Sequence, residues 1–257
     1  MNIIETHELK KQYNGNYVLK GIDLQVQPGQ ILGYIGPNGA GKSTTIKIMS
    51  GIIDSFEGDV TVLGMDVRKS PIEIKKRIGY IPEQAAMYDV LTAREYLDFV
   101  GKLYGLDQKI IISKSTELLR LFDLLDKADN RLSSYSKGMK QKVLLVSGLM
   151  HNPEIVFLDE PLSGLDANAV ILVKEILAQL KLNGRTIFYS SHIMDVVEKI
   201  SDRIIIIDKG EILADGSFEQ LQQQAHLGTL ENIFKSLTAA DVESSHTAKE
   251  FLDVLKS

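Results

Sequence analysis

The sequence lacks two features that would define its class at once: it has no cysteine and no apolar run of membrane length. Without cysteine, a disulfide framework and thiolate chemistry are excluded. The longest β-branched run, residues 204–207, predicts a short buried strand, since a membrane span needs about 20 apolar residues. The N-terminus also lacks the regions of a signal peptide. These absences fit a cytosolic location, so a role at a membrane requires a partner.

A strong charge of one sign is also missing. The net charge of −5 argues against a nucleic-acid binder that works by bulk phosphate neutralisation, although a local basic patch stays possible. The chain is 257 residues long, with 44% hydrophobic and 25% charged residues, which is ordinary for a globular protein. Its length permits one good core and a smaller second lobe.

A glycine-rich segment, residues 36–44, carries the strongest functional signal. It fits the phosphate-loop pattern G-x-x-x-x-G-K-[ST], follows an apolar strand at residues 31–35 and precedes a helix-like run at residues 43–50. Backbone N–H groups and the helix N-terminus would face one anion there, with Lys42 reaching the β- and γ-phosphates and Ser43 binding Mg²⁺. The segment therefore predicts nucleoside triphosphate binding. Its expected contacts are Gly36, Pro37, Asn38, Gly39, Ala40, Gly41, Lys42, Ser43 and Thr44.

Alternating strands and helices predict an α/β core with mostly parallel strands. A hairpin turn at Asn14-Gly15 opens the chain, and its second strand is expected over residues 18–26. Strands are also expected over residues 59–63, 78–81, 155–158, 186–190 and 203–208. Between about residues 85 and 150 helical periodicity replaces them, which indicates a helical insertion. Thr92 with Glu95 forms a capping-box pattern at the first helix of that insertion.

Two carboxylates, Asp159 and Glu160, end the apolar strand at residues 155–158. A strand end beside a phosphate loop suits an Asp that supports Mg²⁺ and a Glu that activates the attacking water. Acidic residues often end strands, so this pattern gains its meaning from the phosphate loop upstream.

Residues 135–141, Tyr-Ser-Lys-Gly-Met-Lys-Gln, stand at an expected helix start and resemble the signature motif of the ATP-binding cassette (ABC) family, commonly Leu-Ser-Gly-Gly-Gln. Ser136 and Gly138 match that form, whereas Tyr135, Lys137 and Met139 depart from it. The resemblance implies that Ser136 and the Gly138 backbone contact the γ-phosphate bound by the opposite subunit. Lys137 adds a positive charge near that site.

Further segments follow the family's order. Residues 163–166 resemble the D-loop at the dimer seam, and residues 190–192 resemble the switch region, whose His192 would touch the γ-phosphate. Tyr13 matches the aromatic residue that stacks on adenine, and Val18 would add apolar contact. The family's Gln sensor after the strand near residue 80 is replaced: Glu83 holds the best register and Gln84 follows it, so the Mg²⁺-sensing position stays open between the two.

The resemblance implies an α/β fold with a P-loop NTPase core, an N-terminal antiparallel β subdomain and an inserted α-helical subdomain. We expect an ABC ATPase domain over residues 1–225, with the helical subdomain at about 85–152, and a C-terminal helical extension over residues 226–257. Residues 135–141, the Pro-Glu pair and the run Leu-Thr-Ala-Arg-Glu-Tyr-Leu resemble the bacterial ABC-2/drug-exporter branch.

The implied function is ATP binding and hydrolysis in an ABC transporter, with ATP and Mg²⁺ as cofactors. The implied partners are a second ABC ATPase chain, identical or different, and integral membrane permease subunits that hold the chain at the cytoplasmic face of the cell membrane. No nucleic acid is expected. The surface at residues 84–91, with apolar Ala85, Ala86, Met87 and Tyr88, is the expected docking site for the permease.

The alternative is a soluble ABC ATPase that acts on ribosomes or DNA. DNA-repair members carry long coiled-coil insertions, and translation members usually carry two cassettes in one chain; the present chain has room for one compact cassette. A P-loop kinase or GTPase has less support, because the sequence has no Asn-Lys-x-Asp guanine-binding motif.

Overall fold

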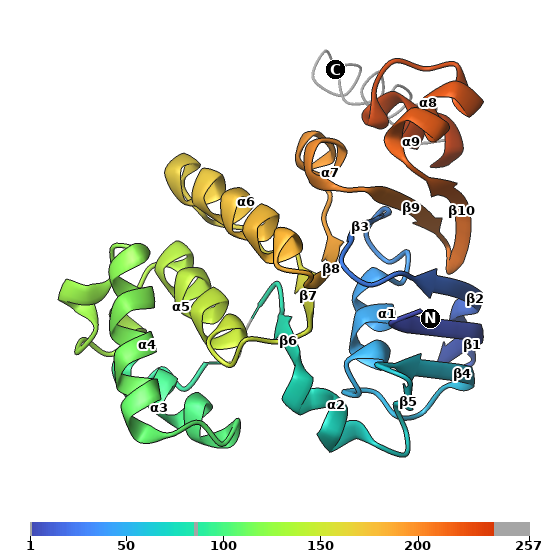
Figure 1. Ribbon diagram of the computed structural model, residues 1–257. Helices are drawn as coiled ribbons and strands as arrows, with labels where there is room; N and C mark the ends of the chain where they lie inside the picture. Colours follow the sequence, from blue (N-terminus) through green and yellow to red (C-terminus); the bar gives the residue numbers. More distant parts are fainter. Residues whose placement is uncertain (1, 85–86, 239–257) are drawn as a thin grey trace, which may run out of the picture.

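A six-stranded sheet forms the centre of the computed structural model, which describes residues 2–84 and 87–238 (Figure 1). Its strand order is β10-β9-β3-β8-β7-β6, and all neighbours are parallel except β9 and β10. The strands are β3 (Ile31–Ile35), β6 (Ile78–Ile81), β7 (Ile155–Asp159), β8 (Thr186–Ser190), β9 (Arg203–Asp208) and β10 (Glu211–Gly216). The mostly parallel α/β core expected from the alternation of elements is confirmed.

The five parallel strands of the central sheet are buried on both faces, as near-continuous apolar strands require. In β9, Ile204 and Ile206 enter one hydrophobic core, while Ile205 and Ile207 enter the other. This alternation confirms the buried strand that the isoleucine run predicts. It also explains why the run carries no polar residue: neither face of the strand meets water.

An antiparallel sheet covers the phosphate-loop side of the core, with order β2-β1-β4-β5. Its strands are β1 (Ile4–Tyr13), β2 (Asn16–Val26), β4 (Glu57–Val62) and β5 (Met65–Asp66). The expected hairpin turn is present, since Asn14 and Gly15 both have positive φ. In Figure 1, helix α1 (Lys42–Met49) lies between the two sheets, and α2 (Pro71–Arg77) leads into β6.

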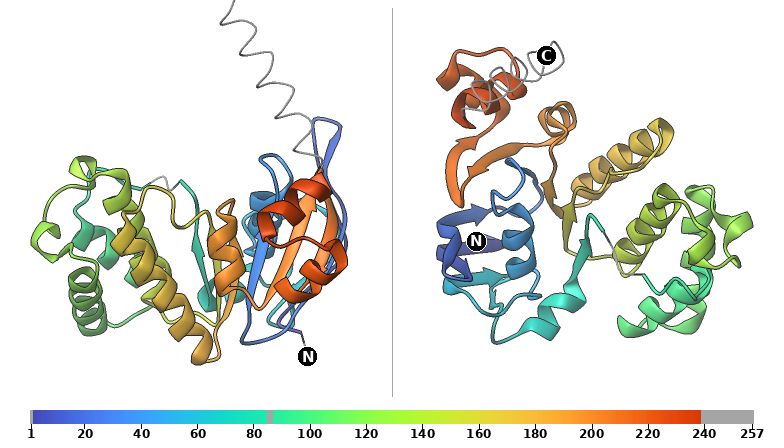
Figure 2. Two further views of the ribbon diagram at one scale, coloured as in Figure 1. Left: turned by 90° about the horizontal axis from the view of Figure 1, so that it is seen from above. Right: turned by 180° about the vertical axis from the view of Figure 1, so that it is seen from behind.

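A lobe of helices lies between β6 and β7 in the chain and to one side of the sheets in space (Figures 1 and 2). It contains α3 (Ala93–Leu103), α4 (Gln108–Leu121) and α5 (Lys137–Leu149), with 3₁₀ turns at Leu125–Lys127 and Leu132–Ser134. The Thr92 capping box is confirmed: Thr92 Oγ1 accepts from the Glu95 N–H, and Glu95 Oε2 accepts from the Thr92 N–H. We call α3, α4 and α5 the helical lobe.

The remaining helices are α6 (Ala167–Leu182), α7 (Met194–Ile200), α8 (Phe218–Ala225) and α9 (Leu230–Thr238). Helix α9 packs on α7 through buried Leu230 and Ile233, and the Leu230 N–H donates to Glu198 of α7. Residues 239–257, part of the expected C-terminal extension, lie outside the described residues. None of the helices in residues 2–84 and 87–238 combines the length and the hydropathy that a bilayer crossing requires.

Candidate nucleotide-binding site

The phosphate loop links β3 to α1. At two of its positions, close packing leaves no room for a side chain, so glycine is required. A Cβ on Gly36 would lie 2.3 Å from the carbonyl oxygen of Ile207, and one on Gly41 would lie 2.5 Å from Leu19. Gly41 also has a φ of 110°, which L side chains rarely adopt. The loop is therefore pressed between β2 and β9, and this packing holds its N–H groups at the start of α1.

Lys42 is buried at the start of α1. Its Nζ donates to the carbonyl oxygens of Gly36 at 2.7 Å and Pro37 at 3.2 Å, so the ammonium lies back along the loop. Loss of water lowers the pKa of Lys42, and the nearby carboxylates of Glu160, Asp159 and Glu83 oppose that shift. A buried cation facing carboxylates in a glycine-rich loop is the arrangement that binds a triphosphate with its divalent cation.

A single cavity brings the expected phosphate and water-activating residues together. The phosphate loop, Asp159 and Glu160 of the β7 end, Glu83 after β6 and Val18 of β2 share its walls. Its lining residues are Val18, Asn38, Gly39, Gly41, Lys42, Ser43, Thr44, Glu83, Asp159 and Glu160. Because β3, β6 and β7 are parallel strands of one sheet, the residues that follow them meet at the same edge.

The surroundings of the Asp159 side chain suit a ligand of a divalent cation. Its side chain is buried, and Oδ1 has no hydrogen-bond partner among the described residues. Asp159 and Ser43 line both this cavity and an adjoining one. In residues 2–84 and 87–238, no group of three or more His, Cys, Asp or Glu side chains is arranged to hold a metal ion. Ser43 and Asp159 present oxygen donors of the kind that hard divalent cations prefer.

Glu160 is held by the segment that follows β8. Its Oε2 lies 2.8 Å from Nδ1 of His192 and accepts a hydrogen bond from Ser191 Oγ at 3.3 Å. Its backbone has a φ of 50° and donates its N–H to the Ser190 carbonyl. Ser191 was not among the expected site residues, although its place beside His192 after an apolar strand was the available signal.

The two sensor candidates differ in their access to the phosphate-loop cavity. Glu83 lines that cavity, whereas Gln84 does not: it lines the adjoining cavity that Glu83, Ser43 and Asp159 also reach, and a further one beside the start of α5. The geometry thus brings Glu83 nearer to the phosphate loop than Gln84.

The signature-like residues lie apart from this cavity. Ser136 is the N-cap of α5, and its Oγ accepts from the Met139 N–H at 3.2 Å, as expected for a helix start. Gly138 packs on the loop after Glu160, where a Cβ would lie 2.4 Å from the Gly164 carbonyl oxygen. Neither residue lines the cavity of its own chain.

Tyr13 also lies outside the lining of the cavity, at the end of β1, and Lys11 Nζ lies 4.8 Å from its ring centroid. Its ring is partly exposed. Val18, on the adjacent strand, does reach the cavity. The structure therefore joins Val18 to the phosphate loop and leaves Tyr13 at the rim of the antiparallel sheet.

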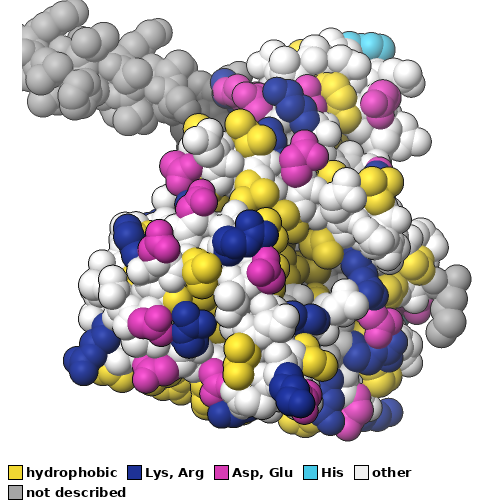
Figure 3. Space-filling view, turned by 60° about the vertical axis from the view of Figure 1, so that its left-hand side comes forward, with side chains coloured by type: hydrophobic (Ala, Val, Ile, Leu, Met, Phe, Trp, Pro, Cys, Tyr) yellow, Lys and Arg dark blue, Asp and Glu magenta, His cyan; other side chains and the backbone are white. Residues whose placement is uncertain are grey.

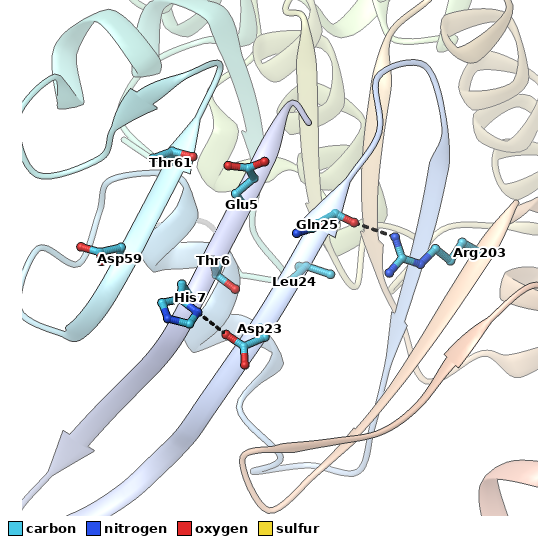
Figure 4. A pocket seen from close by; sticks show the side chains of 9 residues that line it. All are labelled: Glu5, Thr6, His7, Asp23, Leu24, Gln25, Asp59, Thr61 and Arg203. Atoms are coloured by element: carbon cyan, nitrogen blue, oxygen red, sulfur yellow. Dashed lines mark hydrogen bonds and ion pairs between the residues drawn. The ribbon is translucent and has the colours of Figure 1, made fainter. Parts of the chain in front are cut away.

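A different cavity opens on the outer face of the antiparallel sheet (Figure 4). None of the motif residues lines it. The Arg203 guanidinium, which lines this cavity, is already paired. It donates to both carboxylate oxygens of Asp215 at 2.6 Å and to the Gln25 carbonyl. His7 Nδ1 lies 3.1 Å from Asp23 Oδ1. The phosphate-loop cavity is therefore the better candidate for a functional site.

Comparison with known proteins decides the family. The model of the family described as "ABC transporter" matches residues 19–163. The chain belongs to the ABC transporter family. Its mixed α/β fold is that of a solved ATP-binding subunit from this family.

Among the relatives, the chain is 40% identical over 232 residues to an uncharacterized ABC transporter ATP-binding protein of Synechocystis. That match covers 86% of the chain and 64% of the relative, so the chain spans less than two thirds of that protein. The linearmycin resistance ATP-binding protein LnrL of Bacillus subtilis is 38% identical over 215 residues, with 84% of the chain and 69% of LnrL covered. Drug-resistance members of the family are thus among the similar proteins.

The solved structure of an ATP-binding subunit of an ABC transporter superposes with a TM-score of 0.86 at 31% identity. The match spans 91% of the chain and 99% of that structure. A second solved structure is a dimeric ATP-binding cassette in a post-hydrolysis state with ADP and Pi. It superposes with a TM-score of 0.77 at 24% identity, and the match spans 83% of the chain and 98% of that structure. At this identity the likeness supports the fold alone.

Proposed function

We propose that the phosphate-loop cavity hydrolyses Mg²⁺-ATP and that two such chains close around two nucleotides to drive a membrane partner. The observation that carries this proposal is the convergence of Lys42, Ser43, Asp159 and Glu160 on one cavity. Lys42 would move from the loop carbonyls to the β- and γ-phosphates. Adenine would lie against Val18, with Tyr13 stacked on it.

Ser43 and Asp159 would hold Mg²⁺, which supplies charge stabilisation to the phosphate oxygens when it is bound. Both are hard oxygen donors, and the unpartnered Oδ1 of Asp159 gives the ion a buried anionic ligand. We assign the sensor position to Glu83, because it lines the phosphate-loop cavity together with Lys42 and Glu160, and Gln84 does not.

Glu160 is the proposed general base. It would take a proton from a water molecule whose oxygen bonds to the γ-phosphorus, while the bond from that phosphorus to the β–γ bridging oxygen breaks. The products are ADP and inorganic phosphate. His192, which now holds Glu160, would contact the γ-phosphate. A base held by a neighbouring imidazole is oriented before the nucleotide arrives.

The proposal of a two-chain site rests on the position of Ser136 and Gly138. Both lie at the start of α5, and neither lines the cavity of its own chain. A helix start with a capping serine favours an anion. Facing the cavity of a second chain, it would complete that chain's γ-phosphate site. Closure would then require the γ-phosphate, and hydrolysis would loosen the seam.

The proposed permease docks on an apolar groove between α2 and the helical lobe. Ile72 of α2 is 58% exposed and Leu103 of α3 is 68% exposed, and both line the groove. Exposed apolar side chains that gather around one groove mark interaction sites. Tyr88 and Val90, in the surface expected from the sequence, are also exposed, whereas Ala85 and Ala86 lie outside the described residues.

A partner that selects cargo and an export direction are parts of this proposal; the similarity to a linearmycin resistance protein supports export. The ribosome or DNA alternative has less support. Figure 3 shows Lys and Arg side chains interspersed with Asp and Glu on the face that includes the helical lobe, with hydrophobic side chains in a hollow near its centre. We place the chain at the cytoplasmic face of the membrane, held there by the permease.

Glu160→Gln tests this function. The variant keeps its nucleotide contacts but cannot take a proton, so turnover should fall by about 10²-fold or more while ATP with Mg²⁺ stabilises a dimer in size-exclusion chromatography. Hydrolysis at the wild-type rate would refute Glu160 as the base.

Ser136→Arg tests the shared site separately. Its side chain should block dimer formation and leave ATP binding by the single chain within about threefold, because Ser136 lies outside that chain's cavity. Ser136→Ala is the matched control, since it removes the cap but adds no bulk. Equal loss of nucleotide binding in Ser136→Arg would contradict a site shared between chains.

A further inference from the structure

The first turns of α5 contact the loop that follows Glu160, residues 161–166, within the same chain. Every contact comes from one face of the helix and reaches a different residue of the loop. They are Lys137 Nζ to Ser163 Oγ at 2.8 Å, Gln141 Nε2 to the Pro161 carbonyl at 3.1 Å, and Lys142 Nζ to Asp166 Oδ2 at 3.3 Å. The close approach of Gly138 to Gly164 adds backbone packing.

Gln141 makes the contact nearest to the proposed base. Its side chain is 3% exposed, and it donates to the carbonyl of Pro161, which directly follows Glu160. A buried amide is costly unless it is hydrogen-bonded, so this pairing fixes both partners. The chemistry at the cavity does not use Gln141, which does not line it.

The backbone at Glu160 needs support from both sides. Its φ of 50° is uncommon for a residue with a side chain, and such strain persists only where the surroundings hold it. On one side the Glu160 N–H donates to Ser190 at the end of β8. On the other side the Pro161 carbonyl is held by Gln141 of α5.

We propose that Gln141 is a positioning residue for Glu160: its hydrogen bond to the Pro161 carbonyl sets the backbone from which the Glu160 carboxylate reaches the phosphate-loop cavity. Lys137 holds the same loop two residues further on through Ser163. Helix α5 packs against α3 and α4. A movement of the helical lobe would therefore shift Glu160 through the Gln141 contact. This inference rests on the proposed role of Glu160.

Lys137 makes a second contact to the loop, separate from that of Gln141. A lysine in the first turn of a helix opposes the helix dipole, so its presence at this position is unfavourable for the helix itself. Its ammonium pairs with Ser163 and its stem lies 3.1 Å from the position that a Cβ on Gly164 would take. Lys137, which stands where the family usually has a glycine, therefore adds a side-chain contact to the D-loop-like segment.

Gln141→Met tests the proposal, because it keeps volume and burial but cannot donate. We expect kcat for ATP hydrolysis by the full chain to fall roughly tenfold with KM for ATP within about twofold, as a displaced base affects chemistry rather than binding. Ser115→Ala is the control: Ser115 is a buried residue of α4 that donates to Ile112 of its own helix. It should lower the thermal midpoint but leave kcat unchanged.

A double variant separates positioning from general destabilisation. In the Glu160→Gln background, Gln141→Met should change the residual rate by less than about twofold, since the base on which it acts is gone. A tenfold loss that persists there would overturn the proposal, as would an unchanged kcat in Gln141→Met alone. If Glu160→Gln itself hydrolyses ATP at the wild-type rate, the proposed function fails instead.

If Gln141→Met does not fold, Ser163→Ala tests the same support at an exposed contact. We expect kcat to fall about threefold, with the same loss in Lys137→Met and no further loss when both are combined, because each removes the same hydrogen bond. Losses that multiply, or no loss in either variant, would contradict a role for the loop contact.

Discussion

Nδ1 of His192 lies 2.8 Å from Oε2 of Glu160, so the residue proposed to contact the γ-phosphate also holds the proposed base. This relationship joins the end of β7 to the segment after β8. His192→Ala removes both contacts. We expect kcat to fall by about 10²-fold, with ATP affinity within about threefold, because a misplaced base slows chemistry more than binding.

Steady-state ATPase assays and nucleotide titration measure the two quantities. The matched control is His7→Ala, which removes an exposed histidine that pairs with Asp23 on the outer sheet face. That variant should keep the wild-type rate. A normal kcat in His192→Ala would separate His192 from hydrolysis.

The sensor position gives a second prediction. Glu83→Gln removes a carboxylate from the cavity that holds Ser43 and Asp159. If Glu83 is a cation ligand, the Mg²⁺ concentration for half-maximal ATPase rises about three- to tenfold. The measurement is a Mg²⁺ titration at fixed ATP. Gln84→Ala is the control and should leave the midpoint unchanged; the reverse pattern would assign the sensor to Gln84.

The phosphate loop gives a third prediction, on stability. Gly39 and Gly41 both have positive φ, but a Cβ would meet open space at Gly39 and would lie 2.5 Å from Leu19 at Gly41. Gly39→Ala should cost about 1 kcal/mol of unfolding free energy from backbone strain alone. Gly41→Ala should cost about 3 kcal/mol, because strain and overpacking add. Urea unfolding of both variants measures the difference, and equal costs would contradict the packing argument.

Much of the fold was predictable from local patterns. The isoleucine run of β9, the Thr92 capping box and the Ser136 cap each specify an element through nearby residues, and each is present. Boundaries differ slightly: β4 runs Glu57–Val62 rather than residues 59–63, and α1 starts at Lys42 rather than at Ser43. Such ends depend on which terminal residues pair, which local patterns fix poorly.

Elements with few buried residues were not predicted. In α2 only Ile74 is buried, and β10 is an edge strand with only Gly216 buried, so neither carries a strong periodic signal. Helix α8 was missed although Ser217 and Gln220 form a capping box, the available signal. At the site, the phosphate loop and the two carboxylates were predictable from motifs. The bonds from Ser191 to Glu160 and from Gln141 to Pro161 join residues far apart in sequence, so they required the fold.

The ion pair between Arg77 and Glu154, which directly precede β6 and β7, gives the last prediction, on pH. Arg77 donates from Nε and Nη2 to the two carboxylate oxygens of Glu154 at 2.6 and 2.8 Å, and these hydrogen bonds hold the pKa of Glu154 below its ordinary value of 4.5. A depressed carboxyl pKa stabilises the fold above the unfolded value, and the gain is lost as pH falls through the folded value. Glu154→Gln should therefore lower the urea midpoint at pH 7 but not well below pH 4.

Both side chains of this pair are more than a third exposed, so solvent screening limits its contribution to less than about 1 kcal/mol. The control is Glu117→Gln, whose partner Arg120 lies in the same helix, so that pair joins no segments far apart in sequence. The difference in midpoint between wild type and Glu154→Gln should be largest at neutral pH and should shrink in 1 M salt. A difference that stays constant from pH 7 to pH 3 would mean that Glu154 acts through packing rather than charge.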